Sequence, residues 1–404
     1  MSSEVPAEVL AAAMSSESEP AAPAPAPKKK TSRTRAKAGT AAKKQTAPNP
    51  ATGLIAAIKF VSVAQSKTGT VNETFCPLSH HWAAASNGVL TAATRIEEDL
   101  NACPQTALFL DALGRVVDDV SITQLSPGFL SVAAGDFRGI IPCAPAEQVP
   151  ISPPDDPVAT IDDRIKAGFE AVLKVPNESS PSAAKAGILL QAGSIVATNG
   201  AIIFEYWHGI DLPPNMLIPK VAAQAVVKCS KPLAKLGFSS SSVTFWFEDG
   251  SFIKTQTFSE QYPDYQGVLE CDYSRMWPVQ PEFFKAVAAV ATFSEGGRVF
   301  FKAGQIVSDM NAETPSFYRL EGLPEGEGFQ GKYLSMIEGR ATKMLFGQSR
   351  NGIPALFFVG ENMRGCIAAL EQRAPAVYNE GSEGSEGSEG RSSHGADFDD
   401  DIPF

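Results

Sequence analysis

Apolar and polar residues alternate in the middle of the chain, in the stretch VTFWFEDGSFIKTQTF from Val243 to Phe258. A period of two is typical of strands, and Asp249-Gly250 tolerates the positive φ of a two-residue turn. Pro263, in the sequence YPDY that follows, removes a backbone donor and should end the pairing. The pattern predicts two antiparallel strands and an extended exit. Periodicity alone fits any hairpin of this kind.

Apolar residues three and four positions apart mark helices. The clearest is near residue 54, with Lys59 off its apolar face, which carries Leu54, Ile55, Ile58, Val61 and Val63. At 160–175 Thr160 and Asp163 resemble a capped helix start. At 216–236 Pro232 should kink or split the helix. Further helices are expected at 107–116, 278–294 and 328–339.

Strand patterns fill most of the remaining chain. They lie at 82–94 around Asn87-Gly88, and at 120–125, 129–143, 187–207, 298–304, 305–310, 316–322, 342–348 and 353–362, and residues 363–370 end the fold. The order helix, strands, helix, strands therefore occurs three times, with a period of roughly 110 to 120 residues. A length of 404 residues allows two to four domains.

Low-complexity segments enclose the repeats, and residues 144–157 form a linker rich in proline and aspartate. Such end segments cannot bury enough apolar surface to offset their ordering entropy. The predicted organisation is a disordered basic arm (1–50), three repeated domains (51–150, 151–272, 273–374) and a disordered acidic tail (375–404).

Several of these segments resemble the bacterial sliding clamp, the β subunit of DNA polymerase III. The resemblance covers Leu54–Leu370 and is carried by FWFEDG with YPDY, by IVATNG at 195–200, by IPK at 218–220 and by FQGKYL at 329–334. It implies an α+β fold of three repeated clamp domains, each with two helices on antiparallel sheets. It also implies a homodimeric ring around double-stranded DNA that serves DNA polymerase and other replication and repair proteins.

A net charge of −11 is compatible with this function, because phosphate responds to local potential rather than to net charge. Basic residues on the predicted helices would contact the duplex without reading its sequence. An ordinary solvated helix charge is the alternative for each of them. The candidates are Lys59, Arg115, Arg164, Lys166, Lys174, Lys220, Lys228, Lys231, Lys235, Lys285, Lys332 and Arg340.

The resemblance also implies an apolar pocket that takes peptides of partner proteins. Carried over by position, its residues are Thr198, Gly200, Ile203, Pro263, Val268, Ile367 and Leu370. Two departures put the usual peptide in doubt. Ala201-Ile202 stands where clamps have His-Arg, and CIAALEQ replaces the usual clamp ending.

The basic arm carries Lys28, Lys29, Lys30, Arg33, Arg35, Lys37, Lys43 and Lys44. Salt-sensitive contact with nucleic acid and a merely solubilising tail remain equal alternatives for it.

At the other end, an EGSEGSEGSEG spacer leads to Asp397, Phe398, Asp399, Asp400, Asp401, Ile402, Pro403 and Phe404. This tip resembles that of bacterial single-stranded-DNA-binding protein, which implies docking of Phe404 and its carboxylate on partners that recognise that tip. A solubilising tail and an artificial fusion are the alternatives.

Chemistry for catalysis is missing from the sequence. Six dispersed cysteines form no C-x-x-C pair, and the phosphate-loop, dinucleotide and H-E-x-x-H patterns do not occur. His80 and His81, if adjacent on a strand, would point to opposite faces and could not share a metal. We expect no enzyme, cofactor or metal. Neither a secretory signal nor an 18-residue apolar run occurs, so a cytoplasmic protein is expected.

Two other functions remain open. A single-stranded-DNA-binding protein built from clamp-like domains would need exposed aromatic residues among basic ones, and the four tryptophans are Trp82, Trp207, Trp246 and Trp277. A clamp mimic would bind host proteins through Phe404 without encircling DNA. The divergent body, basic arm and unusual tip suggest a bacteriophage protein that acts in an infected bacterial host.

Overall fold

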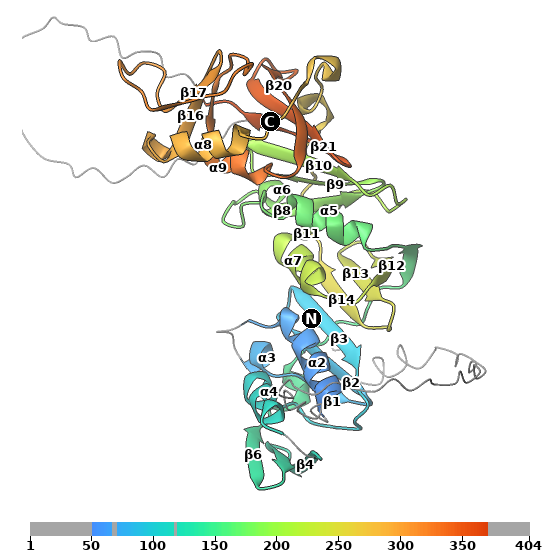
Figure 1. The fold of residues 1–404 in the computed structure, drawn as a ribbon. Coiled ribbons are helices and arrows are strands. Elements are labelled where there is room, and N and C mark those ends of the chain that lie inside the picture. The colour runs from blue at the N-terminus through green and yellow to red at the C-terminus, as the bar shows by residue number, and fades with distance from the viewer. Residues whose placement is uncertain (1–50, 67–70, 117–118, 371–404) are drawn as a thin grey trace, which may run out of the picture. The chain divides into compact units, whose positions relative to one another are not determined.

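The computed structural model describes residues 51–66, 71–116 and 119–370. These form two compact units, the first made of 51–160 with 231–256 and the second of 161–230 with 257–370. Figure 1 labels most of their helices and strands. None of the helices in the described ranges is long and apolar enough to cross a membrane.

The first unit is built on a seven-stranded sheet with the order β1-β2-β3-β14-β13-β12-β7. Its strands are β1 (Leu78–Ser79), β2 (Trp82–Ser86), β3 (Leu90–Arg95), β7 (Pro157–Thr160), β12 (Leu233–Phe238), β13 (Ser242–Phe247) and β14 (Phe252–Gln256). A separate sheet has the order β4-β5-β6 and consists of β4 (Ser121–Ser126), β5 (Phe129–Ala134) and β6 (Phe137–Pro142).

Three α-helices accompany these sheets: α2 (Thr52–Val61), α3 (Val71–Thr74) and α4 (Thr106–Gly114). As expected, α2 buries Leu54, Ile58 and Val61 and leaves Lys59 exposed. This apolar face packs against β2 and β3. The helix-period pattern near residue 54 thus supplies the side chains that close one face of the sheet.

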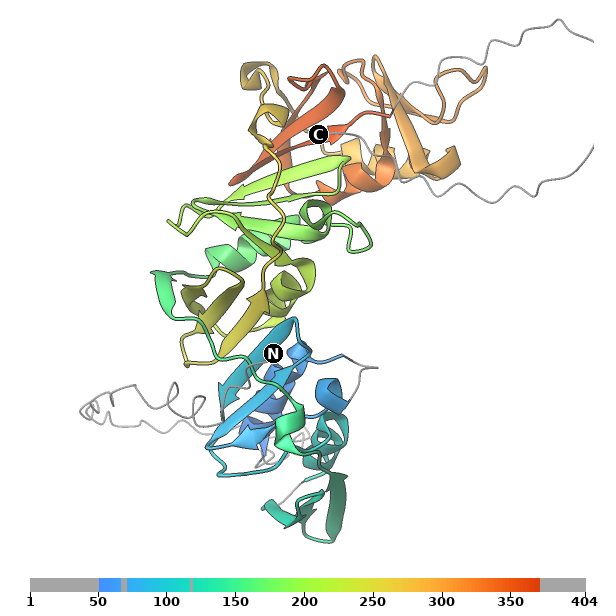
Figure 2. The same cartoon turned by 180° about the vertical axis from the view of Figure 1, so that it is seen from behind.

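The second unit has an eight-stranded sheet in the order β11-β8-β9-β10-β22-β21-β20-β15. Its strands are β8 (Gly187–Gln191), β9 (Ser194–Thr198), β10 (Ile202–Trp207), β11 (Met216–Pro219), β15 (Trp277–Pro278), β20 (Ala341–Gln348), β21 (Pro354–Gly360) and β22 (Met363–Ala368). A four-stranded sheet, β18-β17-β16-β19, contains β16 (Arg298–Lys302), β17 (Gln305–Val307), β18 (Phe317–Arg319) and β19 (Gly328–Gln330). Figure 2 gives the view from behind.

Its α-helices are α5 (Arg164–Val172), α6 (Ala183–Ala186), α7 (Lys220–Lys228), α8 (Phe283–Ala291) and α9 (Gly331–Met336). Helix α5 packs on β9, β10 and α7, and α8 packs on α9 and the four-stranded sheet. An aromatic cluster fills this last contact: the Phe283 and Phe301 rings stack with centroids 5.8 Å apart. The apolar face predicted at 278–294 is therefore the core of this layer.

The predicted threefold repeat of elements is present. A first helix, three strands, a second helix and three strands occur as α2, β1–β3, α4, β4–β6, then as α5, β8–β10, α7, β12–β14, and again as α8, β16–β18, α9, β20–β22. The expected α+β fold class is confirmed. Strands of the predicted domain 151–272 occur in both units, and the domain boundaries stay a prediction.

Four local predictions were wrong in detail. The helix expected at 216–236 ends at Lys228, and Pro232 precedes a strand rather than a kinked helix. Thr160 ends β7, and Asp163 makes no capping hydrogen bond to α5. The β13–β14 turn has three residues, because Phe247 N–H donates to Ser251 O and Gly250 takes the positive φ of 78°. His80 and His81 form a turn with positive φ rather than a strand.

Candidate DNA-contact residues and peptide site

The turn between β9 and β10 carries the first residues of the expected peptide site. Thr198 Oγ1 donates to Ile202 O at 2.9 Å and accepts from Gly200 N–H at 3.1 Å. Asn199 Oδ1 accepts from the Ala201 and Ile202 amides. Gly200 has a φ of 93°, which a residue with a Cβ rarely adopts. Threonine, asparagine and glycine therefore fix this turn by their local chemistry.

Two predicted pocket residues meet in one apolar cluster. Ile203 of β10 and Val268 of the 3-10 helix Gln266–Val268 are 2% and 5% exposed. They pack with Tyr262, Tyr265 and neighbouring buried residues. Burial raises the pKa of the Tyr265 hydroxyl to about 12. Both side chains therefore belong to the packed interior of the second unit.

Thr198 lies opposite Ile203 in the β9–β10 pairing and therefore on the same face of the sheet, whereas the remaining expected pocket residues are not members of the cluster. In the β10–β22 pairing Ile203 faces Cys366, and Ile202 faces Ile367. Because neighbouring side chains on a strand point to opposite faces, Ile367 lies on the other face from Ile203. Cys366, and not Ile367, is a member of the cluster. The register of the sheet decides which of the two side chains lies on the face of Ile203.

Three further positions complete the account of the expected pocket. Leu370 donates its N–H to Gly328 O of β19. Pro263 is exposed. A Cβ on Gly200 would lie 3.2 Å from Lys185 Cε, so the Lys185 chain passes over the turn. The sequence comparison did not identify Lys185 as a neighbour of this site.

A buried ion pair lies beside the cluster. The Arg364 guanidinium of β22 donates to Glu205 of β10 at 2.7 Å, and the Glu205 side chain is 3% exposed. Tyr265 donates its hydroxyl to the other Glu205 oxygen at 2.9 Å. Arg364 also donates to Gln266 and Tyr273. Residues 265–273 are thereby tied to the strands that join the second and third repeats.

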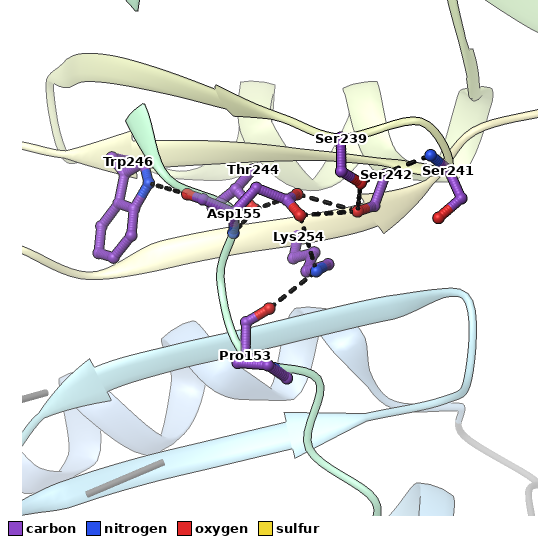
Figure 3. Close-up of polar contacts among 8 residues, drawn as sticks. All are labelled: Pro153, Asp155, Ser239, Ser241, Ser242, Thr244, Trp246 and Lys254. Carbon is purple, nitrogen blue, oxygen red and sulfur yellow. Dashed lines mark hydrogen bonds and ion pairs between the residues drawn. The ribbon is translucent and has the colours of Figure 1, made fainter. Parts of the chain in front are cut away.

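A second buried network ties the linker before the second repeat to two strands of that repeat (Figure 3). The Asp155 carboxylate accepts hydrogen bonds from Ser242 and Thr244 and pairs with Lys254 at 3.0 Å. The Asp155 and Lys254 side chains are 8% and 14% exposed. Lys254 also donates to Pro153 O, and Trp246 donates to Asp155 O. The linker segment 153–155 is therefore bound to β13 and β14.

The structure distributes the DNA-contact candidates over all six repeated helices and their ends. Lys59, Lys174, Lys228, Lys235, Lys285 and Lys332 are exposed. Arg115 and Arg164 are also exposed, and each pairs with a nearby aspartate. Lys166 pairs with Asp163 and Lys285 with Glu282.

Two other candidates are bound to the backbone: Lys220 donates to the carbonyl of Pro176, and Arg340 donates to the carbonyl of Glu170. Lys235 lies on β12 rather than on a helix.

Lys231 is the candidate with the most internal contacts. Its ammonium pairs with Asp249 at 2.7 Å and donates to Thr94 and Ser251. It also lies 4.3 Å from the centre of the Phe60 ring. These contacts join α2 and β3 to the β13–β14 turn. The geometry gives Lys231 a bridging position inside the first unit.

Asp249 should make the first unit sensitive to acid. Burial raises the pKa of its carboxyl, but hydrogen bonds from Lys231 and Ser251 outweigh burial and hold the pKa below its usual value. A lowered folded-state pKa stabilises the fold above the unfolded pKa, and this stability is lost as the pH falls below about 4. Urea midpoints between pH 6 and 3 should therefore fall less steeply for Asp249→Asn than for Asp156→Asn, the exposed control.

Some predicted residues lie outside the described part of the chain. The basic residues from Lys28 to Lys44 and the tip from Asp397 to Phe404 belong to this group. All six cysteines are described and free. Burial raises the pKa of the Cys76, Cys103 and Cys366 thiols to about 12, which makes them poor nucleophiles. No metal-binding group of histidine, cysteine and carboxylate side chains occurs within the described residues.

Comparison by sequence and by structure gave different results. No family model and no curated protein matches the sequence. Solved structures do match. The polymerase III β subunit of Caulobacter crescentus has a TM-score of 0.66 at 17% identity, over 79% of this chain and 98% of that chain. The β subunit from Thermotoga maritima gives 0.67 at 12% identity, over 80% and 98%.

A third similar structure was solved with a bound peptide. The Helicobacter pylori β clamp in complex with a DNA ligase peptide has a TM-score of 0.64 at 14% identity, over 79% of this chain and 98% of that chain. These identities are low, but the match includes nearly the whole length of each clamp. Together with the threefold repeat of elements, it shows that residues 51–370 have the fold of a bacterial DNA polymerase III β sliding clamp.

Proposed function

We propose that this chain is a sliding-clamp processivity factor and that two copies close a ring around double-stranded DNA. The observation that carries the proposal is the rule by which consecutive repeats join. Strand β3 of the first repeat pairs with β14 of the second, and β10 of the second pairs with β22 of the third. In each case the last of the three strands after the first helix of one repeat pairs with the last of the three strands after the second helix of the next repeat.

The same rule leaves two strands for a second copy. Among the described residues, β6 and β18 are the corresponding last strands, and each lies at an open edge of its sheet. If β18 of one copy pairs with β6 of another, three repeats per chain form six modules in a closed ring. Closed two-fold symmetry is the commonest arrangement of such subunits.

Exposed apolar side chains support this pairing. Phe129, on the neighbouring strand β5, is 49% exposed, and Ile140 of β6 is 48% exposed. In the second unit, Phe293 and Phe317 are 71% and 53% exposed. They line an open pocket of about 320 Å³ with Ala289, Val290, Pro315 and Ser316. Apolar patches of this kind on two sheet edges fit an interface between copies.

A single substitution should therefore separate the subunits. Phe293→Asp would place a charge in the apolar interface without changing the buried core, because this side chain is 71% exposed. We expect the mass measured by light scattering to fall from that of two chains to that of one. Val89→Asp changes another exposed apolar residue, 41% exposed at a turn, and should leave the dimer intact. A dimer that persists in Phe293→Asp would contradict this interface.

The proposed DNA contacts follow from the repeat. Each of the six repeated helices carries a basic residue on it or at its end, as in Lys59 of α2, Lys228 of α7 and Lys285 of α8. Contacts of such residues with phosphates would be independent of sequence and weak at high salt. The remaining candidates are proposed on the same basis, and the basic arm would add similar contacts.

Retention on DNA tests the ring. Clamps loaded on a nicked circular plasmid should remain bound in high salt, whereas linearising the plasmid should release them, because a closed ring leaves linear DNA only over its ends. Loss at equal rates from circular and linear DNA would exclude the topological mechanism. The Phe293→Asp variant should be lost from both and serves as the open-ring control.

Recruitment of other proteins is proposed at two places. The first is the surface around Ile203 and Val268, two residues of the expected peptide site that share one cluster, and the Helicobacter pylori clamp was solved with a ligase peptide. The tip ending in Phe404 would bind proteins that recognise the similar tip of single-stranded-DNA-binding protein. Deleting Phe404 should abolish capture of such a protein while DNA retention is unchanged. Capture that survives the deletion would exclude the tip. A bacteriophage origin is part of this proposal.

Binding of single-stranded DNA is the second candidate function. Trp207 is 42% exposed, and the Arg364 guanidinium lies 5.4 Å from its ring centre. An exposed ring with a neighbouring cation is a feature of base-stacking surfaces. Quenching of Trp207 fluorescence by oligo-dT, without any retention on circular duplex, would favour this function over the ring. Trp207→Phe provides the control.

A further inference from the structure

The four-stranded sheet of the third repeat carries basic side chains on one face. Lys302 of β16 pairs with Gln305 of β17, and Gln305 pairs with Arg319 of β18, so these three side chains lie side by side. The residue before Lys302 is Phe301, whose ring stacks on Phe283 of α8. Because neighbouring side chains on a strand point to opposite faces, the face with Lys302 and Arg319 points away from α8.

No acidic residue on the strands balances these cations. Arg298, four positions before Lys302 on β16, adds a third cation to the same face. Strands β16–β19 contain no aspartate or glutamate, although the net charge of the chain is −11. Within the described ranges, Arg298, Lys302 and Arg319 form no ion pair. Arg298 and Arg319 are exposed, and the half-buried Lys302 donates to Met310 O.

Aromatic rings lie on the same face as the cations. Phe300 of β16 is opposite Val307, which is opposite Phe317 of β18. A Cβ on Gly328 would lie 2.5 Å from Phe300 Cδ1, so the half-buried Phe300 ring covers this glycine. Phe317 is 53% exposed, and the Arg319 guanidinium lies 5.7 Å from its ring centre. Cations with interleaved rings are typical of surfaces that bind single-stranded nucleic acid.

The corresponding face of the first repeat is packed. Ala93 of β3 is 0% exposed and belongs to a cluster against which Ile151 of the linker packs. This face points away from α2, because the next residue, Thr94, bonds to the Lys231 ammonium, which lies beside Phe60 of α2.

The corresponding face of the second repeat is packed as well. Val196 of β9 and Ile203 of β10 are 0% and 2% exposed and share a cluster with Val268. A Cβ on Gly168 of α5 would lie 2.7 Å from Ile195, so Ile195 faces α5 and Val196 faces away from it. The third repeat instead presents exposed arginine and phenylalanine side chains at this place.

We propose that the face of Arg298, Phe300, Lys302, Phe317 and Arg319, the basic sheet face, binds single-stranded DNA. The cations would contact phosphates, and the rings would stack with bases without reading their sequence. A duplex keeps its bases stacked inside the helix, so it offers this face only the phosphate contacts. The inference goes beyond the ring, because a chain that does not encircle duplex DNA could still bind a single strand here.

Fluorescence anisotropy of labelled oligo-dT tests the proposal in the full-length protein. Arg298→Ala combined with Arg319→Ala should weaken binding roughly tenfold or more at low salt. The slope of log Kd against log salt should fall by about 1.4, because each phosphate contact on a single strand contributes about 0.7. Arg275→Ala combined with Lys343→Ala removes the same charge from two other exposed positions of the unit and should leave both quantities nearly unchanged.

Phe317→Leu separates stacking from charge. It removes the ring but keeps an apolar side chain, so the proposed interface between copies, which also contains Phe317, is preserved, and light scattering verifies this. Oligo-dT binding should weaken roughly fivefold or more, with no change in the salt slope. An oligo-dT that carries 5-iodouracil should form photo-cross-links to Phe300 or Phe317.

Several outcomes would overturn the proposal. These are an unchanged oligo-dT affinity in the double arginine variant, an equal loss of affinity for a duplex of the same length, and cross-links that map only elsewhere in the chain, such as to Trp207. If the double variant instead loses binding of a polyglutamate peptide and keeps oligo-dT, the face takes an acidic protein segment. Retention on circular duplex should be the same in wild type and double variant, so this test and that of the ring can fail separately.

Discussion

Asp155→Ala should lower the free energy of unfolding of the first unit by about 3 kcal/mol or more. The substitution leaves the Lys254 ammonium, whose side chain is 14% exposed, without its only carboxylate partner among the described ion pairs. It also removes the acceptor for Ser242 and Thr244. A buried charge that loses its partner retains its desolvation cost, so the loss exceeds that of a surface ion pair. Thermal or urea unfolding measures this loss of stability, and hydrogen exchange of the β13 and β14 amides shows where the structure opens.

Asp156→Ala is the matched control, because Asp156 is the next residue in the same linker and is exposed. It should change stability by less than about 0.5 kcal/mol. Asp155→Asn retains an oxygen acceptor but loses the charge, and should give an intermediate value. Equal stability of Asp155→Ala and Asp156→Ala would mean that the buried network does not hold the linker.

Arg364→Ala should have a similarly large effect on the second unit, about 3 to 5 kcal/mol. It leaves the Glu205 carboxylate, 3% exposed, with the Tyr265 hydroxyl but no cation in the described ion pairs. It also releases Gln266 and Tyr273, which Arg364 now contacts. Hydrogen exchange should therefore increase first in residues 262–273 and in the β10–β22 pairing.

Arg275→Ala is the control, since Arg275 is an exposed arginine of the same unit. A double variant, Glu205→Leu with Arg364→Met, removes both charges and should recover much of the loss, because no unpaired buried charge remains. If the double variant is as unstable as Arg364→Ala, the lost contribution is packing of the arginine chain rather than its charge.

The two networks occupy equivalent places in the repeat. Lys254 lies on β14, opposite Thr91 of β3, and Glu205 lies on β10, opposite Arg364 of β22. These are the two strand pairs that join consecutive repeats. The Asp155–Lys254 pair ties the preceding linker to β14. The Glu205–Arg364 pair, with its hydrogen bonds to Tyr265, Gln266 and Tyr273, ties the segment 265–273 to β10 and β22. Neither network was predicted, because their paired charges are 99 and 159 positions apart in the sequence.

Local patterns in the sequence determined much of the fold. The period-two stretch at Val243–Phe258 became β13 and β14, and the helical face at Leu54, Ile58 and Val61 became the buried side of α2. These elements depend on neighbouring residues, so a short window contains the necessary information. The same holds for the order of elements in the three repeats, whereas the clamp fold was expected from a resemblance that FWFEDG, YPDY and IVATNG carry.

Helix ends and turns were less well determined. At 216–236 the apolar spacing continues past Lys228, but the chain turns into β12 because pairing with β13 and β7 satisfies its backbone. The local sequence before Pro232 does not indicate that the chain will leave the helix to pair with other strands. The β13–β14 turn has three residues rather than two because Ser251 pairs with Phe247 and Asp249 accepts from Ser251. Strand register, which fixes these details, is a property of the partner strands.

The sequence by itself determined the order of elements in the repeat and the α+β class, because both depend on contacts within a few positions. Only the tertiary structure decided which side chains meet across the sheets. It placed Cys366 rather than Ile367 beside Ile203, and it gave the Lys231 ammonium to Asp249, Thr94 and Ser251. The physical reason is that strand pairing and burial bring together residues whose distance along the chain carries no information about their contact.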